Sequence, residues 1–170
     1  MARDIGKYDK DLIIGMLADA AKLWLAHDGL WFQAVESRFG MRDAIDLDKE
    51  AWGRFSPIEA KRIMKRQGIP EGGGIEALAR ALDFRLYSYI NEQTIEVVDD
   101  TTLILRMNDC RVQSARERKG LELFPCKEVG IVEYTAFASA IDPRFQTRCL
   151  TCPPDPHPPS HYCAWEFVLG

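Results

Sequence analysis

The chain changes its hydrophobic period near residue 90, and this change limits the possible folds more than any other feature. In the first half, apolar residues recur every three or four positions, as on one side of an amphipathic helix. After residue 91, the segments 94–98 and 101–107 alternate apolar and polar side chains as half-buried strands do, with Asp99-Asp100 as a tight turn. A length of 170 residues fits one domain. The sequence therefore predicts a single domain over residues 1–170, with a helical part at 1–90 and a sheet part at 91–170.

Capping residues give the expected ends of the first two helices. Asp9 can cap a first helix that ends at Gly40, and a second helix runs from near Asp43 to near Gly68. The second helix is expected to kink or restart at Ser56-Pro-Ile-Glu59, a capping box with proline in its first turn. The predicted apolar stripe of the first helix comprises Ile13, Leu17, Ala20, Trp24, His27, Trp31 and Ala34.

The remaining elements complete an α+β order. A third helix is expected at 75–89 after a glycine-rich loop, then a short helix between Asp109 and Gly120, and another from Pro125 to about 140. Two last strands, at about 144–150 and 161–169, flank a proline-rich loop that we expect to act as a stiff lid. The prediction is N-terminal helices packed on a four-stranded antiparallel sheet, in the order strand-strand-helix-helix-strand-strand.

Composition and charge argue against several classes of partner. The formal net charge is −4 and 28% of residues are charged, without the concentrated positive surface that nucleic-acid binding needs. No apolar run approaches the roughly 20 residues that cross a bilayer. Residues 1–7 lack the apolar core of a signal peptide. We therefore expect a cytoplasmic protein that binds neither nucleic acid nor membranes, with its thiols kept reduced.

Five cysteines, an odd number, argue against a complete disulfide framework. Cys110 and Cys126 fall at predicted helix starts, where the helix dipole favours the thiolate. Cys149 and Cys163 fall at the facing ends of the last two strands. If these strands pair, four sulfurs meet at one corner of the sheet, in the tetrahedral arrangement that zinc prefers, with iron as another thiophilic candidate. Further candidate ligands are Cys152, in a Cys-x-x-Cys with Cys149, and His157 and His161 in the lid.

Two other interpretations of the cysteines stay open at this point. The first is that they are small, buried hydrophobic residues that only close the core. The second is that one of them is a reactive thiol, or that two of them form a regulatory disulfide. The sequence alone does not separate these interpretations from a metal site.

The segment from His27 to Phe32 is unusual inside a helix, because Gly29 costs about 1 kcal/mol there relative to alanine. A functional interpretation places its polar and aromatic side chains in a cavity shared with the second helix, where a carboxylate and an imidazole act as acid and base or orient a ligand. The alternative is an ordinary core with a satisfied histidine. The candidate ligand-binding residues are His27, Asp28, Trp31, Glu36 and Trp52.

The cysteine pattern resembles that of a family of small uncharacterised prokaryotic proteins. The resemblance rests on Cys110-Arg-x-Gln, Lys119-Gly-Leu, Phe124-Pro-Cys126, Cys149 and Cys163-x-Trp-x-Phe167. Over about residues 92–169 the chain is more distantly similar to the domain shared by 4-vinyl reductase (hydrocarbon-binding) proteins and L-2-amino-thiazoline-4-carboxylate hydrolase-like proteins. The resemblance implies an α+β ligand-binding fold, often a homodimer, that takes a small apolar molecule or a metal. The chain departs from the distant relatives in its long proline loop and in Cys110-Arg111, where they have Cys-Pro.

Together these features predict a small-molecule-binding or sensor-like protein with a cysteine-rich, metal-binding site. A second hypothesis is a hydrolase of a small heterocyclic or amide substrate, in which a cysteine thiolate or a metal-bound water attacks and His27 or His161 is the base. A third is a structural dimerisation module whose cysteines are buried and inert.

Overall fold

The computed structural model of the chain describes residues 4–170; residues 1–3, part of the segment in which no signal peptide is expected, lie outside the described residues. In chain order the elements are α1 (Lys10–Phe39), α2 (Met41–Gln67), α3 (Gly74–Asp83), the 3₁₀ helix η1 (Leu86–Tyr89), β1 (Glu92–Val97), β2 (Thr102–Asp109), α4 (Arg111–Arg118), α5 (Lys127–Ile141), β3 (Phe145–Thr151) and β4 (Cys163–Leu169). This order confirms the predicted α+β class and the strand-strand-helix-helix-strand-strand arrangement.

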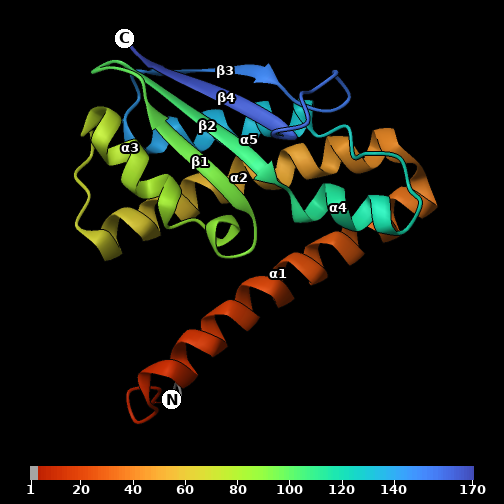
Figure 1. Cartoon of the computed structure of the whole chain (residues 1–170), viewed down its shortest axis with the longest axis horizontal. Coiled ribbons are helices and arrows are strands. Elements are labelled where there is room, and N and C mark those ends of the chain that lie inside the picture. Colours follow the sequence, from red (N-terminus) through yellow and green to blue (C-terminus); the bar gives the residue numbers. More distant parts are fainter. Residues whose placement is uncertain (1–3) are drawn as a thin grey trace.

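The sheet has four strands in the order β1-β2-β4-β3, and every neighbouring pair is antiparallel. Alternate residues of β2, including Leu103 and Leu105, are buried, because one face of the sheet packs on helices (Figure 1). Helix α5 lies against β3, and α2 packs along α5 in the next layer. The core between these layers contains Phe137, Trp165 and Phe167.

A buried ion-pair group joins α2, α5 and the segment before η1. The Arg85 guanidinium lies 2.9 Å from the Glu59 carboxylate and 2.7 Å from the Glu133 carboxylate, and all three side chains are almost fully buried. The same guanidinium lies 4.7 Å from the ring centre of Phe137. Glu59 therefore contributes a long-range ion pair, and its predicted place in a capping box is wrong.

Three element boundaries differ from the prediction. Helix α2 runs unbroken through Pro57, since proline removes only one backbone donor and the adjacent Ser56 is fully buried in the packed face. Helix α3 ends at Asp83, because Arg85 takes an extended conformation that directs its side chain to the buried carboxylates. The cap of α4 is Cys110, since β2 continues through Asp109.

Helix α1 begins after Asp9, whose side chain accepts a hydrogen bond from the Leu12 amide, and ends at Gly40, as predicted. Its C-terminal half packs on α2 and η1, whereas its N-terminal half extends away from the rest of the structure (Figure 1). The expected apolar stripe is only partly right, because Trp24 packs on α2 while His27 and Trp31 are exposed. Within residues 4–170, no helix is both long enough and apolar enough to cross a membrane.

Candidate ligand cavity

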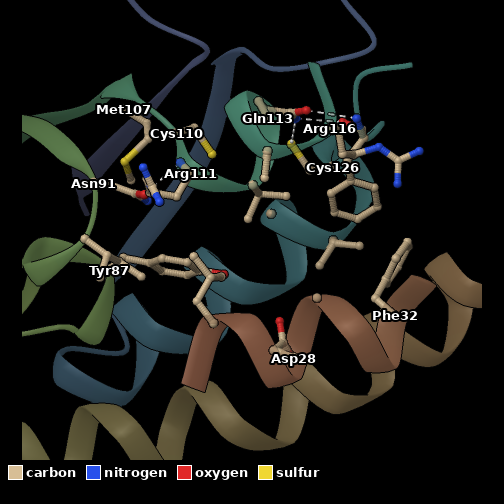
Figure 2. A pocket seen from close by; sticks show the side chains of 18 of the residues that line it. Asp28, Phe32, Tyr87, Asn91, Met107, Cys110, Arg111, Gln113, Arg116 and Cys126 are labelled. Atoms are coloured by element: carbon tan, nitrogen blue, oxygen red, sulfur yellow. Dashed lines mark hydrogen bonds between the residues drawn. The ribbon is translucent and has the colours of Figure 1, made fainter. Parts of the chain in front are cut away.

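A cavity of about 430 Å³ lies between α1, α4 and the first turns of α5. Figure 2 shows Asp28 and Phe32 of α1 on one side and Cys110, Gln113 and Cys126 on the facing side. Most of its surface is apolar and aromatic. A second, smaller cavity of about 180 Å³ adjoins the first. Asp28 of α1 and Asp48 and Trp52 of α2 line both cavities. The aromatic neighbours and the carboxylates therefore form one continuous site between the helical part and the sheet part.

Two glycines shape the cavity in opposite ways. Gly29 of α1 lines it, and a Cβ added there would meet nothing within 4 Å, so this helix position opens onto empty space. Gly130 of α5 also lines it, but a Cβ there would lie 2.5 Å from the Trp165 ring. Gly130 is therefore required for the close approach of the indole, whereas Gly29 leaves room for a ligand.

The cavity contains two carboxylates, Asp28 and Asp48, that form no ion pair within the described part of the chain. Burial raises the pKa of Asp28, and the neighbouring His27 partly opposes this shift. Burial raises the pKa of Asp48 to about 7, with further upward contributions from Asp28 and Glu133 and a smaller downward one from a Trp52 hydrogen bond. Asp48 therefore titrates near neutral pH.

Aromatic rings surround the two carboxylates. Trp52 stacks on Tyr87 with ring centres 5.8 Å apart, and Trp24 meets the Tyr87 ring edge-on at 5.3 Å. Phe32 packs against Phe124 at 4.7 Å on the other side of the cavity. This combination of rings and uncompensated negative charge is the environment in which organic cations bind.

Four of the five cysteines, Cys110, Cys126, Cys152 and Cys163, line the cavity, while Cys149 does not. The Cys126 and Cys152 sulfurs are 3.4 Å apart, and the Gln113 amide donates a hydrogen bond of 3.4 Å to Cys126. The loop that carries Cys152 is held against the start of α5 by backbone and side-chain bonds of Lys127. The fold therefore brings thiols from three separate segments into contact.

At Cys110, burial outweighs the effect of the helix dipole. Burial raises the pKa of the Cys110 thiol to about 12, which contradicts the thiolate expected at this helix start. Burial also raises the pKa of Cys149 to about 11. Hydrogen bonds from Cys152 and the Trp165 indole lower the pKa of Cys163. Across residues 4–170, no group of three or more histidine, cysteine or acidic side chains is arranged to hold a metal ion, so zinc or iron binding stays an unsupported prediction.

Several predicted site residues lie elsewhere. His27 and Trp31 are exposed, and Glu36 pairs in a bidentate manner with Arg116 at 2.8 and 3.0 Å. His157 and His161 are partly exposed in the proline-rich loop, and the cavity lining found among the described residues includes no histidine. Of the predicted ligand-binding residues, Asp28 and Trp52 line the cavity.

Sequence reasoning missed Asp48, Tyr87 and Glu133 as members of this region. A signal for Asp48 was present, since it precedes the buried Trp52 by one helical turn on α2. Tyr87 carried no such signal, because its position depends on the break between α3 and η1.

Residues 6–169 match the model of DUF6125, a family of unknown function. The match covers nearly the whole described chain, so the chain belongs to this family. Neither the curated proteins nor the solved structures contain a significant match. The more distant similarity to the 4-vinyl reductase and L-2-amino-thiazoline-4-carboxylate hydrolase-like domains therefore stays a prediction.

Proposed function

We propose that this member of DUF6125 binds a small, largely apolar organic amine in its cation form. The observation that carries the proposal is a pair of carboxylates, Asp28 and Asp48, that have no ion-pair partner within residues 4–170 and lie in the wall of an aromatic cavity. A volume of about 430 Å³ is within the range of small-molecule sites. The ammonium group would lie at the carboxylates and the apolar body of the ligand would fill the space beside Gly29.

The charges around the cavity support a positively charged ligand. An ionised carboxylate away from water is unstable until a cation or hydrogen-bond donor compensates it. The positive side chains that line the cavity among the described residues have other partners or are exposed to water. Arg116 pairs with Glu36, and Lys119 and Arg118 donate hydrogen bonds to Gln33 and Ser114. Lys22 and Arg111 are exposed and form no ion pair with Asp28 or Asp48. Charges in water are screened strongly, whereas partly buried carboxylates keep most of their field.

A bound cation should also change the titration of the site. Because it favours the ionised form of Asp48, whose pKa is about 7 in the free protein, its affinity should rise with pH below 7 and become constant above it. The limiting slope is about tenfold per pH unit if one proton is released on binding. An apolar neutral ligand should show no such slope.

The test uses matched pairs of aromatic amines and their neutral alcohol analogues, measured by isothermal titration calorimetry and by quenching of tryptophan fluorescence. Amines should bind at least about tenfold more tightly than the alcohols, and Asp28→Asn should remove most of the difference. Equal binding of both series, or binding of acids in preference to amines, would contradict the charge assignment.

A steric variant tests the location. Gly29→Leu directs a side chain into the cavity and should abolish binding, while alleviating the unfavourable helix propensity of glycine. Gly15→Leu is the matched control, because Gly15 is on the same helix, also has open space around it and lies outside the cavity. If both variants bind amines as the native chain does, the ligand lies elsewhere.

A further inference from the structure

Helix α1 presents a second apolar surface on its outer side, and one member of this surface, Leu30, also lines the cavity. Along its outer side, positions alternate by three and four residues, which is the spacing of a coiled-coil seam. Its members are Ile13, Met16, Ala20, Leu23, His27, Leu30 and Ala34. All except Ile13 are exposed, and Leu23 and Leu30 keep 69% and 65% of their surface open. We call these residues the α1 seam.

The α1 seam is on the opposite side of the helix from the residues that meet the body. Ala21 is buried, and Asp28, Phe32 and Val35 are partly buried on that inner side. In the N-terminal half only a few side chains pack at all, and this half projects from the molecule (Figure 1). The N-terminal half of α1 is a helix of about 15 residues, which has little stability by itself in water. It also exposes large apolar side chains.

We propose that the α1 seam pairs in antiparallel orientation with the α1 seam of a second copy of this chain. One register places a large side chain opposite a small one in the outer layers. These layers are Met16 with the partner's Ala34, Ala20 with the partner's Leu30, and Ile13 with the partner's Ser37, one turn beyond the seam. In the central layer, Leu23 lies opposite the partner's His27, so an aliphatic side chain meets an imidazole. Two-fold symmetry repeats each layer, so the seam is complementary to itself over roughly 36 Å of helix.

The flanking positions agree with this register. On one flank, Leu17 lies opposite the partner's Trp31, so pairing would cover a ring that is 68% exposed in the single chain. On the other flank, Asp19 lies opposite the partner's Gln33, a polar pair at the solvent boundary. A parallel, in-register pair would instead place Ala20 on Ala20 and His27 on His27, which leaves gaps and brings two imidazoles together. The observed pattern of sizes favours the antiparallel arrangement.

Substitution of a seam leucine tests the surface. Sedimentation equilibrium and light scattering should find a dimer of the native chain at micromolar concentration. Leu23→Lys should raise the dimer dissociation constant by at least about 100-fold, since the seam would bury two ammonium groups. Leu47→Lys is the matched control, because Leu47 is 54% exposed on α2 and lies outside the α1 seam. A monomeric native chain at 100 µM, or equal effects of the two variants, would overturn the proposal.

A layer exchange tests the register. Ala20→Leu should weaken the dimer by about tenfold, because the added side chain meets the partner's Leu30. Adding Leu30→Ala in the same chain should restore the affinity, since this layer then again pairs one large and one small residue. Circular dichroism confirms that each variant keeps its helix content. If Ala20→Leu instead strengthens the dimer, the helices are parallel and the proposed register is wrong.

Discussion

Replacement of Asp48 by asparagine should make the protein more stable, by an amount that depends on pH. Asp48 has a folded pKa of about 7 against an ordinary value of 3.8, because burial and the nearby Asp28 and Glu133 oppose its ionisation. The native state therefore holds a proton that the unfolded chain releases, and the stability of the native protein falls as pH rises through this window. Asparagine keeps the neutral shape and can still accept the Trp52 hydrogen bond.

The size of the effect follows from the two pKa values. A shift from 3.8 to about 7 corresponds to about 4 kcal/mol when the group is fully ionised. Between pH 5 and pH 7, the advantage of Asp48→Asn over the native chain should grow by about 2 kcal/mol, and it should become constant near pH 8. At pH 4 and below, both chains carry a neutral group here and should differ little.

Urea unfolding followed by tryptophan fluorescence at pH 5, 6, 7 and 8 measures this difference, at one fixed protein concentration so that any association contributes equally. Asp46→Asn is the control, because Asp46 is exposed on the same helix and pairs with Arg42. Its effect should stay within about 0.5 kcal/mol at every pH. A difference between Asp48→Asn and the native chain that does not change with pH would refute the assignment of Asp48 as a buried, proton-holding carboxyl.

Three further outcomes follow from other contacts. Mild oxidation should form a disulfide between Cys126 and Cys152 before any other pair of thiols, since their sulfurs are already 3.4 Å apart. Peptide mapping under non-reducing conditions identifies the first disulfide, and a different first pair would contradict this contact. Arg85→Leu should lower the free energy of unfolding by about 3–5 kcal/mol, because it leaves the buried carboxylates of Glu59 and Glu133 unpaired. The control Arg54→Leu breaks only the exposed ion pair with Glu50 and should change the free energy of unfolding by less than about 1 kcal/mol. Gly130→Ala should cost about 1–3 kcal/mol in urea unfolding, because its Cβ would lie 2.5 Å from the indole ring packed on it.

Local rules predicted those parts of the fold that local interactions determine. Asp9 and Gly40 bound α1 as expected, because a capping hydrogen bond and a glycine with positive φ each act within a few residues. The rules failed where a distant contact was stronger. Pro57 did not break α2, whose inner face is buried against α5, and α3 ended early because Arg85 reaches two carboxylates on other helices.

The candidate site was predicted less completely, and the reason is visible in α1. Its sequence has apolar residues on more than one side, so periodicity alone did not show which side meets the body. Of the candidate ligand-binding residues on this helix, Asp28 lines the cavity, whereas His27 and Trp31 are exposed. The thiolate expected at Cys110 failed for a similar reason, since burial depends on segments far away in the chain.

The two proposals depend mostly on different sides of one helix, and although Leu30 belongs to both the α1 seam and the cavity lining, variants at other positions separate them. The inner side of α1 contributes Asp28 and Gly29 to the cavity, while Leu23 and Ala20 belong to its outer side. Gly29→Leu should therefore abolish amine binding without dissociating the dimer, and Leu23→Lys should dissociate the dimer while the cavity keeps its preference for amines over alcohols. If Leu23→Lys also removes that preference, the segment of α1 that carries Asp28 and Gly29 needs the second copy to hold the cavity wall in place. In that case the α1 seam contributes to ligand binding. Dimerisation would already have ordered α1, so the ligand would lose less binding free energy to ordering the helix that carries Asp28.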